Sequence, residues 1–138
     1  METQGPAVKA QIRILIIDDE PPLLRMMSLY LQRLGYAVTT LDGTEPALAL
    51  VPEGIQEYAA VVLDATMEGI PMETLACDML RAHPGLRVLA ASGYPVDMRA
   101  LEAAAPGRVA FLHKPFTPEA LAAAVRRMIG AEEKEKGV

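Results

Sequence analysis

The chain has 138 residues, 51% of them hydrophobic and 22% charged, which is enough length and apolar content for one folded domain. Its 18 acidic and 13 basic residues give a net charge of −5, and only 4% of the residues are aromatic, so neither a basic phosphate-binding surface nor a base-stacking platform is expected. A single cysteine excludes an internal disulfide, and no apolar run approaches the ~20 residues of a membrane span, so we expect a cytoplasmic protein that binds neither nucleic acid nor a membrane.

The pattern of apolar residues predicts strands and helices that alternate along the chain. After a flexible N-terminal arm at residues 1–11, the β-branched run at 12–17 predicts a strand that is buried on both faces. A helix follows from Pro21, with apolar residues three or four positions apart, and Gly35 ends it. Further strands are predicted at 37–40, 59–63, 87–91 and 109–112, and further helices at 44–51, around 75–80 and at 96–104.

The last predicted helix has clear boundary signals. Thr117 is a candidate N-cap, Pro118 is the first helical residue, and Gly130 is expected to end the helix. Residues 131–138 would then form a charged C-terminal tail. Five strands alternating with five helices predict an α/β fold at residues 12–130, a doubly wound parallel sheet with helices on both faces and the flavodoxin-like strand order 2-1-3-4-5.

Polar side chains interrupt this apolar framework where the predicted strands end. Asp18 and Asp19 follow the first strand, Asp64 follows the third, Ser92 the fourth and Lys114 the fifth. The carboxyl ends of parallel strands meet at one edge of a sheet, which is where such folds bind ligands. We therefore expect these side chains to converge in one pocket.

Such a pocket favours magnesium-assisted phosphoryl chemistry. Its carboxylates repel one another and Lys114 alone cannot neutralise them, whereas a hard divalent cation can. Asp19, Asp64 and a backbone carbonyl of the following loop, with that of Thr66 as the candidate, would leave coordination positions open for a phosphate oxygen. A carboxylate can also attack phosphorus to form an aspartyl phosphate, and Lys114 and the metal would stabilise the charge on the transferred group.

Four segments carry these residues: 14–21 (ILIIDDEP), 61–64 (VVLD), 91–94 (ASGY) and 111–116 (FLHKPF). In this order and at these strand ends, they resemble the phosphoacceptor receiver domain of two-component response regulators. The resemblance implies that Asp64 accepts a phosphoryl group from a histidine kinase or a phosphotransfer protein. It also implies that Asp18 and Asp19 hold Mg²⁺ together with Asp64, and that Lys114 contacts the phosphate.

The resemblance further implies how the signal leaves the domain. Ser92 would move to hydrogen-bond a phosphoryl oxygen and Phe111 would change rotamer in response, so both are candidate switch residues. The added charge would bias an existing two-state equilibrium. The usual contact surface of the family is the face formed by the fourth helix, fifth strand and fifth helix. Only eight residues follow Gly130, so we expect the output to pass to another protein. The bond from Lys114 to Pro115 is expected to be cis, as is usual in the family.

The loop after Asp64 departs from the family pattern. Receivers typically carry Pro four residues after the phosphoacceptor and Gly four residues further on, where this chain has Glu68 and Met72. The path of the loop is therefore open, and Glu68 is expected to add a carboxylate near the phosphate and so to weaken phosphorylation or change the lifetime of the phosphoryl group.

We therefore expect a phosphorylated signalling switch that is not an enzyme acting on other substrates. Two alternatives to this function remain open. The first is a receiver-like interaction module that is never phosphorylated. The second is a hydrolase with Asp64 as its turnover nucleophile, similar to the haloacid-dehalogenase-like phosphatases. Those phosphatases carry a second Asp two residues after the nucleophile, where this chain has Thr66.

Overall fold

The structure is a computed structural model that describes residues 11–137, with side chains described from 11 to 130. Its strands form one parallel sheet in the order β2-β1-β3-β4-β5, which confirms the predicted fold class and strand order. The strands are β1 (Arg13–Ile17), β2 (Ala37–Leu41), β3 (Ala60–Asp64), β4 (Arg87–Ser92) and β5 (Val109–His113). The helices are α1 (Pro21–Arg33), α2 (Thr44–Gly54), the 3-10 turn η1 (Ile55–Glu57), α3 (Met72–Ala82), α4 (Arg99–Ala104) and α5 (Pro118–Gly137).

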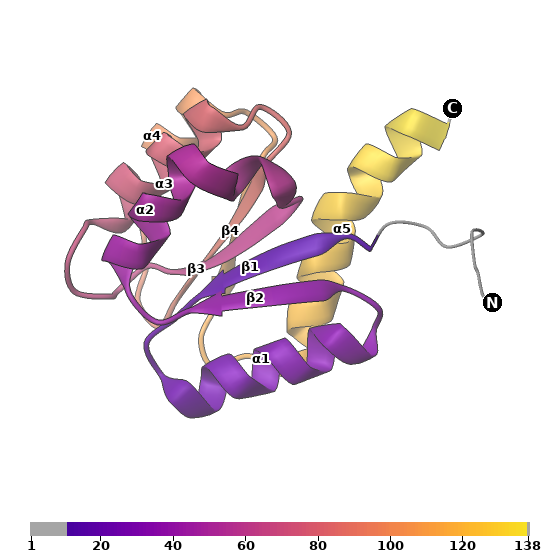
Figure 1. The fold of residues 1–138 in the computed structure, drawn as a ribbon, viewed down its shortest axis with the longest axis horizontal. Coiled ribbons are helices and arrows are strands. Elements are labelled where there is room, and N and C mark those ends of the chain that lie inside the picture. Colours follow the sequence, from indigo (N-terminus) through magenta and orange to yellow (C-terminus); the bar gives the residue numbers. More distant parts are fainter. Residues whose placement is uncertain (1–10, 138) are drawn as a thin grey trace.

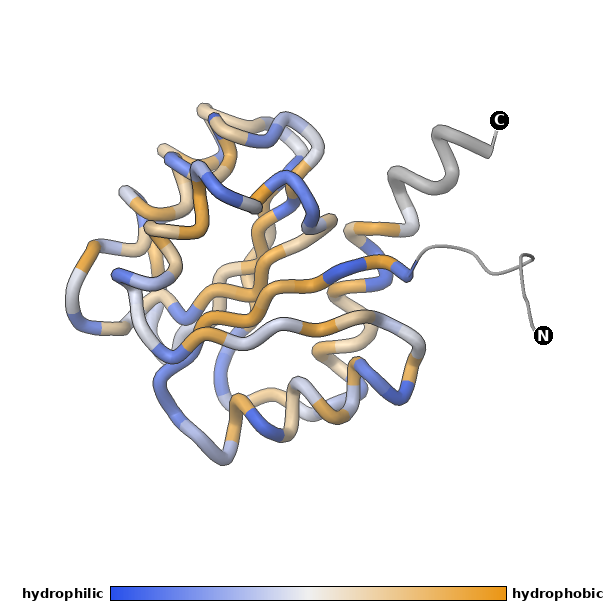
Figure 2. Tube along the Cα trace, in the orientation of Figure 1, coloured by the Kyte–Doolittle hydropathy of each residue, from blue (hydrophilic) through white to orange (hydrophobic). Residues whose placement is uncertain are grey.

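Helices cover both faces of the sheet. Figure 1 shows α1 and α5 on one side of the strands and α2, α3 and α4 on the other. Hydrophobic residues concentrate along the strands between these two layers (Figure 2). The arrangement divides the apolar interior into two cores that share the sheet.

Strand β1 shows why the sequence selects this architecture. Ile14 and Ile16 belong to the core under α1 and α5, whereas Leu15 and Ile17 belong to the core under α2, α3 and α4. All four side chains are fully buried, which confirms the prediction of a strand buried on both faces. Since successive side chains of a strand point to opposite faces, an unbroken apolar run is what a sheet between two helical layers requires. Each such burial contributes about 1.5–3 kcal/mol.

The predicted signals at three helix boundaries are confirmed. Pro21 begins α1, and Gly35, just beyond its end, has φ +102°, a conformation that glycine adopts without steric cost. Thr117 caps α5, because its hydroxyl accepts a hydrogen bond from the backbone N–H of Ala120 at 3.0 Å.

Two predicted helix boundaries were wrong. Gly130 does not end α5, which continues through Gly137 because one glycine costs only about 1 kcal/mol in a helix and strong helix formers follow it. Residues 131–137 are therefore helical. Helix α4 begins at Arg99 and not near residue 96, because the Asp97 carboxylate accepts a hydrogen bond from the Arg99 N–H at 3.0 Å and holds the preceding residues in a turn.

Arg108, just before β5, ties three backbone segments together. Its guanidinium donates hydrogen bonds to the carbonyl oxygens of Leu80 at 3.1 Å, His83 at 2.6 Å and Leu86 at 2.9 Å. These carbonyls lie at the end of α3 and in the turn before β4. One side chain therefore links the end of α3 and the following turn to the start of β5.

The predicted N-terminal arm lies outside the described residues except for its last member, Gln11, which donates a side-chain hydrogen bond to the carbonyl of Gly35 at 3.1 Å. Among the described residues, no helix has the length and apolar character needed to cross a membrane.

Candidate functional site

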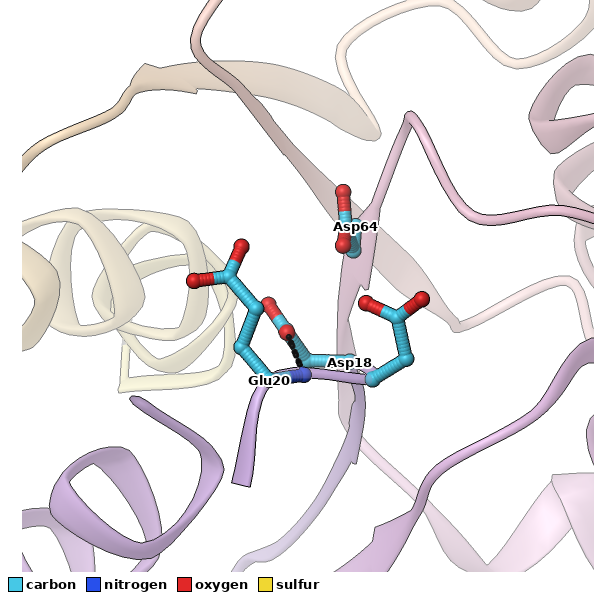
Figure 3. A group of neighbouring side chains, drawn as sticks. Asp18, Glu20 and Asp64 are labelled. Carbon is cyan, nitrogen blue, oxygen red and sulfur yellow. Dashed lines mark hydrogen bonds between the residues drawn. The ribbon is translucent and has the colours of Figure 1, made fainter. Parts of the chain in front are cut away.

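The carboxyl edge of the sheet gathers the acidic residues predicted there. Asp18 directly follows β1, Asp64 is the last residue of β3, and each is about 2–3% exposed. One carboxylate oxygen from each of Asp18, Asp19, Glu20 and Asp64 lies within 4.8 Å of the others. Figure 3 shows the side chains of Asp18, Glu20 and Asp64 converging, with the backbone N–H of Glu20 donating to Asp18 Oδ1 at 2.9 Å.

Lys114 joins this acidic cluster from the end of β5. Its Nζ lies 3.1 Å from Asp18 Oδ2, 3.3 Å from Glu20 Oε2 and 3.5 Å from Asp64 Oδ2. The Lys114 side chain is 13% exposed, so its charge is largely removed from bulk water. One ammonium among several carboxylates leaves the site with a net negative charge, as expected from the sequence.

Burial acts in opposite directions on the pKa values of Asp18 and Lys114, yet both pKa values are raised. Burial raises the pKa of Asp18 above its ordinary value of 3.8, although the Glu20 N–H and the Lys114 ammonium oppose the shift. Burial by itself lowers the pKa of Lys114, but the hydrogen bond and charge of Asp18, helped by Asp64 and Glu20, outweigh it and raise that pKa above 10.5.

Asp64 is oriented by the residue two positions after it. Its Oδ1 accepts hydrogen bonds from the Thr66 backbone N–H at 3.0 Å and from the Thr66 hydroxyl at 2.9 Å. Its Oδ2 lies on the side of Lys114. The role of the Thr66 hydroxyl was missed in the sequence, where Thr66 was considered for its carbonyl alone; a short hydroxyl side chain two residues after an acid is the signal that could have indicated it. The Thr66 carbonyl as a metal ligand stays a prediction.

The two residues predicted to switch, Ser92 and Phe111, lie on the neighbouring strands β4 and β5. Ser92 ends β4 fully buried, and its hydroxyl accepts a hydrogen bond from the Tyr94 N–H at 3.0 Å. Phe111 lies on β5 with 37% of its surface exposed and stacks on His113 with ring centroids 6.4 Å apart. Because side chains alternate along a strand, Phe111 points away from the pocket that Lys114 enters. Their switching stays a prediction.

The structure adds Glu20 to the predicted site residues. Glu68 is exposed, and its carboxylate is not part of the acidic cluster; its effect on phosphorylation stays a prediction. Glu20 was not assigned to the site from the sequence, although it continues the acidic run of Asp18 and Asp19, and the turn after β1 brings its side chain back to Lys114.

The donors of the acidic cluster fit a magnesium ion. All are carboxylate oxygens, the ligands that hard divalent cations prefer, and they come from two strand ends and the turn between β1 and α1. Asp18 and Asp64 are buried while Asp19 and Glu20 are exposed, so the cluster is open to solvent on one side. A cation that keeps several waters can be held in such an arrangement.

Comparison with known proteins decides what this site belongs to. The family model described as response regulator receiver domain matches residues 14–126. This range includes every residue of the acidic edge, and it includes all five strands apart from the first residue of β1. The chain belongs to this family. Receiver domains act in two-component signalling, generally as switches and not as classical enzymes, and they typically bind Mg²⁺ at an acidic pocket such as the one formed here.

Curated relatives carry receiver domains within longer proteins. The chain is 29% identical over 120 residues to the sensor kinase CckA of Brucella abortus, matching 87% of this chain and 13% of that protein. It is 32% identical over 121 residues to the C4-dicarboxylate transport transcriptional regulatory protein DctD of Pseudomonas aeruginosa, matching 87% and 26%. It is 28% identical over 123 residues to the DNA-binding response regulator MtrA of Mycolicibacterium smegmatis, matching 89% and 53%. The receiver domain thus spans about half or less of these relatives.

Solved receiver structures share the fold. A CheY-like response regulator receiver domain protein from Methanospirillum hungatei superposes with a TM-score of 0.77 at 24% identity, covering 91% of this chain and 99% of that one. The BeF3-activated receiver domain of DrrB, a protein of Thermotoga maritima, superposes with a TM-score of 0.71 at 26% identity, covering 88% and 99%.

The cis bond between Lys114 and Pro115, implied by the resemblance, is present.

Proposed function

We propose that this receiver domain is a phosphorylation-dependent switch that accepts a phosphoryl group on Asp64 from a histidine kinase or a phosphotransfer protein. The observation that supports it best is the Asp64 carboxylate, buried at the end of β3, oriented by Thr66 and facing Lys114 at 3.5 Å. A nucleophilic carboxylate needs to be fixed in position and to have a cation beside the place where charge gathers.

In the proposed reaction, an Asp64 oxygen forms a bond to phosphorus while the bond from phosphorus to the donor breaks, and the donor retains the electron pair. Lys114 moves from its carboxylate partners to a phosphoryl oxygen and so offsets the charge on the transferred group. Ser92 breaks its hydrogen bond with the Tyr94 N–H and donates to another phosphoryl oxygen. Asp18 and Asp19 would hold Mg²⁺ with Asp64, and the ion would neutralise charge on the phosphate when bound.

The donor has an open approach to this site. A cavity of about 630 Å³ lies beside the acidic cluster, lined by Glu20 and Lys114 together with apolar side chains at the start of α1 and at the start of the β5–α5 loop. Leu23, Met26 and Phe116 are among these apolar side chains. We infer that the phosphodonor protein approaches Asp64 from this side, which leaves the face of α4, β5 and α5, with the exposed Phe111, for a downstream partner.

The proposal is tested by incubating the protein with acetyl phosphate and Mg²⁺ and measuring its intact mass. The wild type should gain one phosphoryl group, and Asp64→Asn, which keeps the shape of the side chain, should gain none. Asp97→Asn is the matched control, because it removes an exposed carboxylate that, among the described side chains, pairs with Arg99 alone, and it should label like the wild type.

An unlabelled wild type would overturn the proposal and favour the receiver-like module that is not phosphorylated. The NMR spectrum with beryllofluoride and Mg²⁺ separates the cases, since a site able to hold a phosphoryl group should show shifted Asp64, Ser92 and Lys114 signals. Steady release of phosphate from small esters would instead favour the hydrolase alternative.

A further inference from the structure

The loop between β3 and α3, residues 65–71, carries Thr66 and departs from the family pattern at Glu68. In the described part of the chain, residues 67–70 form hydrogen bonds with one group only, the hydroxyl of Thr44. Thr44 is the first residue of α2, lies on a different βα unit and is 2% exposed. Side chains of Met67 and Ile70 also pack against the core under α2 and α3, but they are apolar and do not fix the orientation of the backbone.

The hydrogen bonds of Thr44 use both capacities of its hydroxyl. The oxygen accepts from the Ile70 N–H at 3.0 Å, while the single proton is shared between Glu45 Oε1 at 3.1 Å and the Glu68 carbonyl at 3.4 Å. A hydroxyl donates only one proton, so its acceptor role toward Ile70 is the constant one. Losing it would leave a partly buried backbone N–H without a partner.

Gly69 shows how closely the loop approaches Thr44. Its φ of +107° disfavours any other residue, and a Cβ atom added there would meet the Thr44 hydroxyl inside contact distance. Glycine at this position therefore allows the backbone to reach the hydroxyl. Two residues of the loop, Glu68 and Gly69, are thus matched by Thr44 across from them.

The hydrogen bonds of Thr44 are connected to the proposed acceptor, Asp64, through the β3–α3 loop. Thr66 donates two hydrogen bonds to Asp64 Oδ1, and it belongs to the same loop that Thr44 holds four residues later at Ile70. The other end of the loop is fixed by the Ala65 N–H, which donates to the Ala91 carbonyl at 2.8 Å. Hydrogen bonds to β4 on one side of Thr66 and to Thr44 on the other thus hold the Thr66 backbone in place.

We propose that Thr44 is a positioning residue for phosphoryl acceptance, which it promotes by holding the β3–α3 loop so that Thr66 orients the Asp64 carboxylate. This inference rests on the proposed function of Asp64. Thr44 does not touch the reacting atoms; it acts through the loop. Because Thr44 begins α2, a partner that binds this end of α2 would affect the orientation of the Asp64 carboxylate through the same hydrogen bonds.

The test compares Thr44→Val with Thr44→Ser in the full chain. Val keeps the shape but can neither accept from Ile70 nor donate, whereas Ser keeps the hydroxyl. The initial rate of labelling by acetyl phosphate and Mg²⁺ should fall about tenfold in Thr44→Val, as expected for the loss of one buried hydrogen bond, and should stay within about twofold of wild type in Thr44→Ser.

Tyr58→Phe is the matched control for lost stability. It removes a hydrogen bond of the same length, from the Tyr58 hydroxyl to Thr39 Oγ1 at 3.0 Å, and Tyr58 precedes β3, so it lies at the opposite end of that strand from Asp64. This variant should lower the melting temperature without changing the labelling rate. The Thr66 amide NMR signal should shift in Thr44→Val and not in Tyr58→Phe.

Equal labelling rates in Thr44→Val and the wild type would overturn the inference while leaving the proposed function intact. Equal rate losses in Thr44→Val and Tyr58→Phe would also overturn it, because stability alone would then explain the effect. An unlabelled wild type is the separate failure of the proposed function. If Thr44→Val is folded too poorly to assay, Thr44→Ala with Thr44→Ser as its rescue gives the same comparison.

Discussion

Lys114 Nζ lies 3.1 Å from Asp18 Oδ2 and is thereby closer to this carboxylate than to the proposed acceptor, Asp64, at 3.5 Å. The same ammonium that would stabilise a transferred phosphoryl group therefore occupies the acidic edge beforehand. We expect a bound divalent cation to compete with Lys114 for the same carboxylate oxygens, and so to free the lysine for the role in transfer proposed above.

Lys114→Met is expected to separate these two functions. Without the ammonium, the carboxylates repel one another more strongly, so Mg²⁺ should bind at least about tenfold more tightly while acetyl phosphate labelling falls. Isothermal titration calorimetry measures the first effect and intact mass the second. Arg99→Met, which removes a cation from an exposed pair with Asp97, should change neither. Weaker Mg²⁺ binding in Lys114→Met would contradict the competition.

The raised pKa of Asp18 predicts how Mg²⁺ binding depends on pH. A proton and the metal compete for the carboxylate, so the affinity should begin to fall at a higher pH than the 3.8 of an ordinary aspartate suggests. Low pH weakens Mg²⁺ binding but favours the folded state at this group. The raised pKa of Asp18 contributes folding stability that is present at low pH and is lost as the pH rises through the folded-state pKa. Calorimetric titrations at decreasing pH, with circular dichroism to verify the fold, test this; a midpoint at or below 3.8 would speak against it.

Lys114 should make an alkaline contribution to stability. Its pKa is raised in the folded protein, so its contribution is fully present below the unfolded value of 10.5 and is lost as the pH rises through the higher folded value. Melting temperatures of the wild type and Lys114→Met, measured without metal, should therefore differ by a pH-independent amount at neutral pH and change in their difference only above 10.5. A difference that changes near neutral pH would assign the effect to another group.

Arg108→Lys is expected to destabilise the fold although the charge is kept. A lysine ammonium cannot reproduce the planar fork that donates to the carbonyls of Leu80, His83 and Leu86, so we expect a loss of about 2–3 kcal/mol in the free energy of unfolding. Urea denaturation measures it. The exposed Arg126, changed to Lys, should alter the stability by less than about 0.5 kcal/mol. Equal effects at both positions would show that Arg108 acts through its charge alone.

Phe111→Ala is expected to cost much less stability than a core substitution. Phe111 is 37% exposed, whereas Leu101 of α4 is 1% exposed. Leu101→Ala should lose about 2–5 kcal/mol and Phe111→Ala less than about 1.5 kcal/mol, with acetyl phosphate labelling unchanged in the latter. A large loss in Phe111→Ala would place its ring in the core and remove it as a switch at the surface.

The parts of the fold that follow from local periodicity were predictable. The unbroken apolar run of β1 requires two covered faces, and the alternation of strands and helices leads to a parallel sheet whose carboxyl edge collects Asp18, Asp64, Ser92 and Lys114. Helix ends that depend on weak or competing preferences were not. At Gly130 the strong helix formers that follow outweigh the glycine, and before α4 the Asp97 side chain forms a turn that apolar spacing does not reveal.

In the site, the sequence indicated which residues meet but not how they are arranged. The direction of Glu20 depends on the turn formed by its own N–H and Asp18 Oδ1. The contact of Thr44 with residues 68–70 joins positions about 25 residues apart, and no single-sequence pattern reports a contact of that range.

The place of β5 at the edge of the sheet has a consequence for the cost of signalling. Ser92 contributes its carbonyl to the Lys114 N–H at 2.8 Å and to the ring of His113 at 3.4 Å, and His113 stacks on Phe111. If Ser92 and Lys114 rearrange on phosphorylation, as we propose, the change would reach the protein surface along this outermost strand, at the exposed Phe111 and His113. The other β5 residues pack against the two cores: Val109, Ala110 and Leu112. We therefore expect substitutions at the two exposed positions to alter the output with less effect on folding than substitutions at the three packed ones.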